Sequence, residues 1–181
     1  DEGCNDPGNS DFDVGPRNVW PRGTFETGRP FVCHEFLNLC VKQDTRLESL
    51  YTGAWCAPDR RSDREKWLAL RGLNLAWGDA LQNAQHTLQG VYQKRGLESA
   101  RKDPFCDGYC FWTIVDVVIA NGAIHSAQGL FDPFWQDKRG GLTARDFVKF
   151  NGTSVILTDF SPSCPVVTSG DSRSVTFFVA N

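Results

Sequence analysis

The sequence predicts an α+β protein with a helical N-terminal and central part, C-terminal antiparallel β-hairpins and disulfide bridges. Three observations predict this class. Apolar residues recur at helical spacing before residue 95, apolar segments separated by turn residues follow residue 147, and seven cysteines are spread along 181 residues. Helices followed by strands are typical of one α+β domain. We predict a single domain over 1–181, with an irregular arm at 1–30, a mainly helical region at 31–122 and an antiparallel sheet at 144–181.

The first predicted helix covers residues 31–42. Pro30 takes a position that is favoured in the first helical turn. The apolar residues that follow have the spacing of one helical face: Val32, Cys33, Phe36, Leu37, Cys40 and Val41. In such a helix Cys33 and Cys40 lie about 10 Å apart, too far to bridge each other, so each is expected to bind another segment. A further helical turn is expected near Leu47 to Leu50.

The second helical segment is predicted from Ser62 to about Arg95. Ser62 and Glu65 form a capping-box pattern. The strongest apolar stripe of the chain follows: Leu73, Trp77, Leu81, Ala84, Leu88 and Val91. One unbroken helix of this length would extend about 50 Å, longer than a compact domain of this size is wide, so we expect a break at residues 72–74. His86 lies among glutamines and is expected to face solvent.

Residues 109–120 are compatible with a strand or a helix. Six β-branched residues favour a strand, whereas Asp107 before the segment and Asn121-Gly122 after it are typical of helix caps. Because of its length we interpret the segment as a buried helix.

The last forty residues predict antiparallel strands. In the first hairpin, residues 147–150 and 153–157 flank Asn151-Gly152, the dipeptide most typical of a two-residue hairpin turn. A second pair, Pro165 to Thr168 and Ser174 to Val179, flanks the turn residues 169–172.

Composition and charge exclude several classes of protein. Hydrophobic residues make up 40% and charged residues 23%, which is an ordinary globular balance. A net charge of −3 argues against a nucleic-acid partner. The longest apolar stretch, 109–120, is interrupted by Asp116 and is too short to span a membrane.

The cysteines indicate an oxidising compartment. Cys-x-x-Cys does not occur, so a disulfide framework is favoured over zinc, and we expect it to include Cys33, Cys40, Cys56, Cys106 and Cys110. Seven is an odd number, and neither the pairing nor the unpaired thiol follows from the sequence. The chain starts at Asp1 and lacks methionine, which we interpret as removal of a secretion signal. Asn151 is expected to carry a glycan because Asn151-Gly152-Thr153 is a glycosylation acceptor.

Two sets of residues are candidates for catalysis. Cys110 can serve as a nucleophile if it lies at a helix N-terminus, with His125 or His34 as its base. Asp116 stands between Val115 and Val117, and a carboxyl in apolar surroundings has a raised pKa. Paired carboxylates of this kind hydrolyse glycosides. His34-Glu35 lacks the second histidine of a zinc motif, so we predict no metal and no cofactor.

The aromatic segment Phe131, Phe134 and Trp135 is a candidate binding surface. Pro133 excludes a regular helix through it, so the three rings lie in a loop that either covers the core or presents a contact patch.

From these features we favour binding over catalysis. The leading hypothesis is a secreted, disulfide-stabilised glycoprotein that binds a host or competitor molecule, as an effector, virulence factor, toxin or elicitor does. Its partner would be a protein or a glycan. The alternatives are a small secreted hydrolase, based on cysteine or carboxylate chemistry, and a carbohydrate-binding module with Phe134 and Trp135 as a stacking platform.

Overall fold

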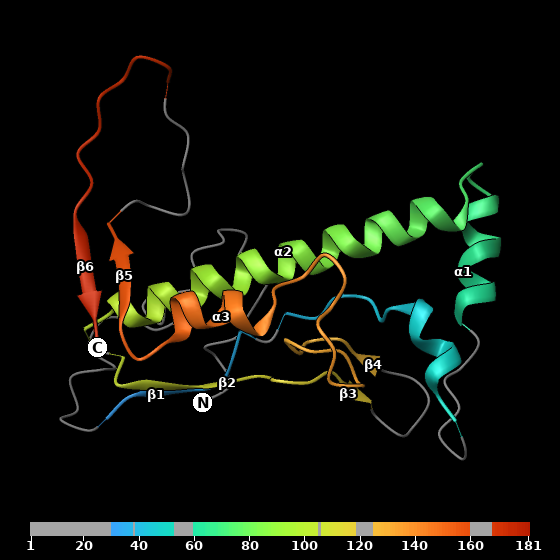
Figure 1. Cartoon of the computed structure of the whole chain (residues 1–181), viewed down its shortest axis with the longest axis horizontal. Helices are drawn as coiled ribbons and strands as arrows, with labels where there is room; N and C mark the ends of the chain where they lie inside the picture. Colours follow the sequence, from blue (N-terminus) through green and yellow to red (C-terminus); the bar gives the residue numbers. More distant parts are fainter. Residues whose placement is uncertain (1–29, 38, 53–59, 105, 119–124, 160–167) are drawn as a thin grey trace. The chain divides into compact units, whose positions relative to one another are not determined.

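The fold is a mixture of helices and small sheets, in agreement with the predicted α+β class (Figure 1). The computed structural model describes residues 30–37, 39–52, 60–104, 106–118, 125–159 and 168–181. In chain order its elements are β1 (Val32–Phe36), the 3₁₀ helix η3 (Thr45–Leu50), α1 (Arg60–Ala69), α2 (Leu75–Lys102), β2 (Gly108–Phe111), β3 (Val117–Val118), β4 (His125–Ser126), α3 (Ala144–Asn151), β5 (Val155–Thr158) and β6 (Phe177–Ala180). Within these residues no helix has the length and apolarity that crossing a membrane requires.

The described residues form two compact units, each assembled from separate parts of the chain. Unit 1 takes its residues from 1–39, 91–112 and 143–181, and unit 2 from 40–90 and 113–142. Helix α2 contributes its N-terminal part to unit 2 and its C-terminal part to unit 1. The organisation of residues 1–181 as a single domain stays a prediction.

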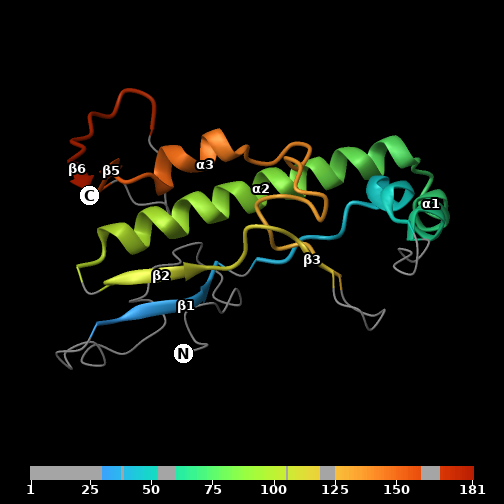
Figure 2. The ribbon, with the colours of Figure 1, turned by 60° about the horizontal axis from the view of Figure 1, so that its bottom comes forward.

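Unit 1 has an apolar core and two pairs of strands. β1 and β2 run parallel, with Cys33 opposite Tyr109, and β5 pairs antiparallel with β6. Helix α3 lies beside the C-terminal part of α2 in both views (Figures 1 and 2). The buried apolar side chains of the unit are Cys33, Phe36, Leu37, Tyr92, Leu97, Ala100, Phe150, Val155 and Leu157.

Unit 2 has a largely polar interior. Its buried apolar side chains are Leu47, Ala127 and Leu130, whereas its buried polar ones are Asp44, Thr45, Gln82, His86, Gln89, Gln128, Asp132 and Lys138. In the part of α2 that belongs to unit 2, the buried side chains are polar, while the predicted apolar stripe is exposed at Trp77, Leu81 and Leu88. Burying polar groups is unfavourable unless they are hydrogen-bonded. Such an interior is therefore poorly explained by stability alone.

The predicted break in the central helix is confirmed. α1 ends at Ala69 and α2 begins at Leu75, with Gly72 between them in the left-handed region at φ 68°. The Asn74 side chain accepts a hydrogen bond from Trp77 N (3.1 Å) at the start of α2. The turn near Leu47 is present as η3. Because α1 begins at Arg60, Ser62 lies inside the helix rather than at its N-cap.

The helix predicted over 31–42 is wrong, because Val32–Phe36 is strand β1. Its register shifts between Cys33 and Phe36, and Glu35 has a φ of 50°. Because of this irregularity, the side chains of Cys33 and Phe36 are both buried although the two residues are three apart in the strand. A bulged strand thereby acquires the spacing of a helical face.

The helix predicted over 109–120 is also wrong. Its residues form β2 and β3, joined by an extended segment in which Val115 bridges to Phe131. The β-branched composition of the segment was the correct indicator, and its length was misleading.

The hairpin predicted around Asn151-Gly152 is wrong as well. Residues 144–151 are helix α3, and Gly152 is its C-cap. Thr143 and Asp146 form a capping box at the helix start, a pattern that is visible in the sequence. The Asp146 carboxylate accepts hydrogen bonds from Lys149 and Thr143, and these bonds hold the pKa of Asp146 at about 2. An antiparallel sheet does follow, but β5 pairs with β6 across a long connection.

Candidate active site

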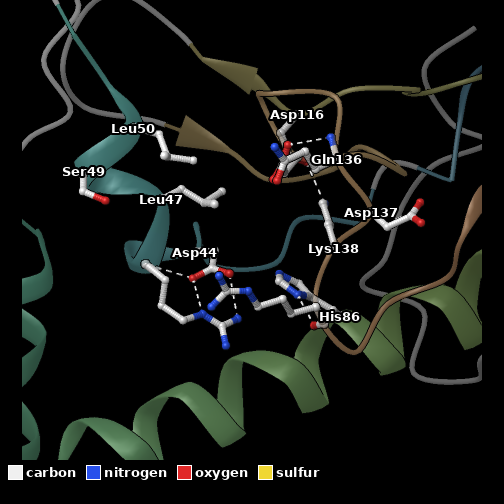
Figure 3. A pocket seen from close by; sticks show the side chains of 12 residues that line it. Asp44, Leu47, Ser49, Leu50, His86, Asp116, Gln136, Asp137 and Lys138 are labelled. Carbon is white, nitrogen blue, oxygen red and sulfur yellow. Dashed lines mark hydrogen bonds and ion pairs between the residues drawn. The ribbon is translucent and has the colours of Figure 1, made fainter.

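Unit 2 contains a pocket of about 190 Å³ lined mainly by polar and charged side chains (Figure 3). Helix α2, η3 and the segment 113–142 supply its walls. The lining residues are Asp44, Arg46, Leu47, Ser49, Leu50, His86, Asp116, Asp132, Gln136, Asp137, Lys138 and Arg139. Typical pockets for drug-sized ligands measure about 300–1,000 Å³. This one therefore suits a single small polar unit.

A buried ion pair between Asp116 and Lys138 forms the centre of this wall. Lys138 Nζ lies 2.7 Å from Asp116 Oδ1, and the two side chains are 3% and 9% exposed. Gly129 N donates a second hydrogen bond to the same oxygen (2.7 Å). Lys138 also donates to Gln89 Oε1 (3.1 Å) and to the carbonyl of Ala127 (3.5 Å). Removing either partner would leave the charge of the other buried and uncompensated, which is strongly destabilising.

Burial favours the neutral form of both partners, so it raises the pKa of Asp116 and lowers the pKa of Lys138. It raises the pKa of Asp116 from an ordinary value of 3.8 to about 6, although Lys138 and the Gly129 amide act in the opposite direction and the charge of Asp132 adds to the rise. The same burial lowers the pKa of Lys138, against the stabilising charge of Asp116. A carboxyl that titrates near pH 6 exchanges its proton close to neutrality, which is what a general acid or base must do.

Asp132 is the second buried carboxylate of the pocket. Its Oδ1 accepts hydrogen bonds from Phe134 N (2.8 Å) and Gln136 N (2.9 Å). These bonds use a single carboxylate oxygen. Asp132 therefore both shapes the aromatic loop and adds negative charge to the pocket that holds Asp116.

His86 and Gln82 form a buried polar layer on helix α2, so the expectation that His86 faces solvent is wrong. His86 Nδ1 lies 2.9 Å from the carbonyl of Arg139 and therefore donates to it, which leaves Nε2 to accept from Gln82 Nε2 (3.0 Å). Burial lowers the pKa of His86. A neutral imidazole with both nitrogens engaged supports the pocket wall rather than acting as its base.

Asp44 and Arg46 form a second ion pair at the start of η3. Arg46 Nε and Nη2 lie 2.7 Å and 2.6 Å from the two Asp44 oxygens, a bidentate arrangement. Burial alone would raise the pKa of Asp44, but the hydrogen bonds and charge of Arg46 hold it below its usual value. The pKa of Asp44 is therefore shifted in the opposite direction to that of Asp116.

The sequence-predicted cysteine site is differently placed. Cys110 is exposed in strand β2 of unit 1 and does not lie at the N-terminus of a helix, where a nucleophilic cysteine was expected. His34 is exposed in β1, and His125 belongs to β4 of unit 2. Among the residues whose side chains are described, no group of three His, Cys, Asp or Glu residues is arranged to hold a metal ion.

The other predicted residues are found in both units. In the aromatic loop Phe134 packs edge-on against Tyr51 with ring centroids 4.9 Å apart, whereas Trp135 is 67% exposed. Asn151 ends α3 and accepts a hydrogen bond from Tyr109 Oη (2.6 Å). No two cysteines of the described ranges are joined by a disulfide, and Cys33 and Cys106 approach to 4.0 Å between their sulfur atoms. Cys4, Cys56 and Cys164 lie outside those ranges.

Four pocket residues are not among the candidates that the sequence indicates: Asp132, Gln136, Lys138 and Arg139. Lys138 and Arg139 stand in a polar stretch that is typical of an exposed turn, yet Lys138 is buried. Asp132 and Gln136 stand next to aromatic residues in the chain, and only the three aromatic residues of this segment are predicted as functional. The sequence feature that could have indicated these residues is a charged residue on each side of Pro133-Phe134-Trp135, Asp132 before it and Lys138 after it.

Comparison with models of known protein families gives no match, and comparison with curated protein sequences gives none either.

Proposed function

We propose that this protein is a hydrolase in which Asp116 acts as the general acid, the carboxylate branch of the alternatives raised by the sequence. The observation that carries the proposal is the buried Asp116 in the unit 2 pocket, with a pKa raised to about 6 and a second carboxylate, Asp132, in the same wall. Strongly shifted titratable groups in a pocket are typical of catalytic sites. The cysteine branch has less support because Cys110 lies in a strand.

The chemistry needs one acid and one base. Water attacks the electrophilic carbon of the substrate, and the bond from that carbon to the leaving oxygen breaks. Asp116 gives its proton to the leaving oxygen, while the proton lost by the water passes to the Asp132 carboxylate. After the reaction Asp116 is ionised and Asp132 is protonated. Proton exchange with solvent then returns Asp116 to its protonated form and Asp132 to its ionised form. Two carboxyl groups in these roles are the general solution for glycoside hydrolysis.

Substitution of Asp116 by Asn tests the proposal. A positioned general acid contributes about 10²- to 10⁴-fold, so we expect Asp116→Asn to lose at least 100-fold in kcat/KM on a panel of 4-nitrophenyl glycosides and esters. Because the acid must be protonated, the wild-type rate should fall as the pH rises above about 6. The control is Asp63→Asn, an exposed carboxylate on α1. Equal rates from Asp116→Asn and wild type, or no wild-type activity on the panel, contradict the proposal.

A second candidate function is recognition of a host or competitor molecule without turnover, the leading hypothesis from the sequence. The exposure of Trp135, a large aromatic side chain beside the pocket-lining Gln136, favours it. The two functions differ in one result: a recognition protein binds its target with the same affinity and leaves it intact whether residue 116 is Asp or Asn.

We also propose that the protein is secreted and disulfide-bridged, with Cys33 and Cys106 as one pair. Their sulfur atoms are 4.0 Å apart, about 2 Å more than a disulfide bond requires. The two thiols would lose two protons and two electrons to a disulfide-carrying oxidoreductase, whose own disulfide is reduced to a dithiol. The extracellular placement is proposed from the cysteine content of the chain, and such a placement supplies the oxidising conditions that this pairing needs.

A further inference from the structure

The loop Phe131–Asp137 is held in one shape by its own hydrogen bonds. Asp132 N donates to Gln136 O (2.9 Å), and Trp135 N donates to Asp132 O (3.0 Å). The Asp132 side chain accepts from Phe134 N and Gln136 N inside the loop. At its base, Phe131 pairs with Asp137 and with Val115. The loop is therefore a rigid projection and not a flexible connection.

Trp135 occupies an unfavourable position at the tip of this loop. Its φ is 62°, in the left-handed region that glycine and asparagine tolerate and bulky residues avoid. Its side chain is 67% exposed, with one neighbouring ring, Phe131, at 6.4 Å between centroids. Backbone strain and exposed aromatic surface both oppose stability. A residue that combines them in a fixed loop is explained by what it contacts outside the molecule.

Trp135 stands in the chain between residues that line the polar pocket. The next residues, Gln136 and Asp137, line that pocket, as does Asp132 on the other side of the tip. The pocket offers the carboxylates of Asp132 and Asp137 as acceptors together with the guanidinium of Arg46 as a donor. A ligand that suits this mixture carries groups that both donate and accept, and hydroxyl groups do so. An anion or a cation alone would leave one half of the set unmatched.

We propose that the ligand is a neutral carbohydrate, with one sugar ring in the pocket and the apolar C–H face of an adjacent ring stacked on Trp135. This inference rests on the proposed function, because it names the substrate class of the same site. A pocket of about 190 Å³ accommodates one ring, so a chain of sugars must continue outside it. Trp135 then acts as a binding residue for the second sugar.

The test measures binding separately from hydrolysis. Calorimetry with cellotetraose, xylotetraose, mannotetraose, maltotetraose and chitotetraose should give binding of at least one by the wild type and by Asp116→Asn. Trp135→Gly should bind that tetrasaccharide at least tenfold more weakly. Because glycine relieves the φ of 62°, its melting temperature should equal or exceed that of the wild type. The matched control is Trp77→Ala, an exposed tryptophan on α2, which should bind like the wild type.

Three outcomes overturn the inference: no binding of the five tetrasaccharides, equal binding by Trp135→Gly, or preferential binding of adenosine monophosphate or choline, which also associate with aromatic rings. Failure of the proposed function gives a different pattern. If tetrasaccharide binding depends on Trp135 but Asp116→Asn hydrolyses the panel as the wild type does, the carbohydrate assignment stands and the general acid is wrong. If esters are hydrolysed through Asp116 and no sugar binds, the hydrolase stands and the substrate class is wrong.

Discussion

At the scale of single residues, Lys138 sets the charge state of the pocket. Its ammonium is surrounded by three acceptors: the Asp116 carboxylate, the Gln89 side chain and the Ala127 carbonyl. Its positive charge lowers the pKa of Asp116, and burial, which acts more strongly, raises it. Burial and the charge of Lys138 are the two largest of the effects that together give a pKa of about 6, and the hydrogen bonds from Lys138 and the Gly129 amide, together with the charge of Asp132, contribute the rest.

Removing that charge should shift the balance in a known direction. In Lys138→Met the burial of Asp116 remains and the opposing charge is lost, so its pKa should rise above about 6, by about one to three units. Carbon NMR titration of the Asp116 carboxyl measures the shift, and the falling limb of the pH–rate profile should move to higher pH with it. Lys66→Met, at an exposed ion pair on α1, should leave both unchanged. An unaltered Asp116 pKa in Lys138→Met contradicts this account of the pocket.

The residues differ in how far the sequence predicts them. Asp116 is visible as a candidate because it is a single carboxylate inside the apolar stretch 109–120. Lys138 and His86 stand in polar stretches that resemble ordinary surface. His86 contacts the Arg139 carbonyl, which is about 50 residues away in the chain. Lys138 contacts the Ala127 carbonyl, which is 11 residues away. No local pattern records such contacts.

At the scale of elements, Gly129 allows the Asp116 segment and the aromatic loop to approach each other. A Cβ atom at this position would lie 2.3 Å from Asp116 N and from the carbonyl carbon of Val115. Both atoms belong to the backbone, which cannot yield as a side chain does. The Gly129 amide also donates to the Asp116 carboxylate, so the same close contact supplies one of its hydrogen bonds.

Gly129→Ala should therefore be severely destabilising. We expect a loss of about 3 kcal/mol or more in the free energy of unfolding, because the two backbone segments must separate. Urea denaturation followed by far-UV circular dichroism measures it. Gly108→Ala is the matched comparison: its added Cβ would meet only Val32, at 3.9 Å, and should cost less than about 1 kcal/mol. Equal stabilities for the two variants would show that the close approach at Gly129 is unimportant.

The elements also show why some patterns mislead. The break between α1 and α2 follows from helix length and from Gly72, both of which are local properties, and it was predicted. In β1 the irregular register gives a strand the apolar spacing of a helix. The Asn151-Gly152 pair stands at the end of helix α3 and not in a hairpin turn. The Thr143–Asp146 capping box starts a helix upstream, and the dipeptide ends that helix. Each error arises where one short pattern fits two structures.

At the scale of the whole molecule, the two units differ in what they bury. Unit 1 buries apolar side chains, as a stabilising core does, whereas unit 2 buries glutamines, carboxylates, a histidine and a lysine. Composition describes the average of both and predicts an ordinary globular protein. The difference between the units, and with it the position of the pocket, depends on contacts that the sequence pattern does not encode.

The proposed disulfide is a property of the molecule as secreted. When the protein is isolated from an oxidising compartment, peptide mapping under non-reducing conditions should recover Cys33 and Cys106 in one cross-linked peptide. Cys33→Ser and Cys106→Ser should each lower the free energy of unfolding by about 2–4 kcal/mol under oxidising conditions, and the double variant by no more than either. Blocked thiols paired with other cysteines would contradict the assignment, and reduced thiols at both positions would contradict secretion as well.

The account depends most on the ionisation of Asp116, and its pKa can be measured without any substrate. The titration follows the carbon-13 resonance of the Asp116 carboxyl, assigned by its absence from Asp116→Asn. We predict a midpoint near pH 6. A midpoint near the ordinary aspartate value of about 4 would mean that this carboxyl is solvated and unexceptional, and the proposed general acid would be wrong.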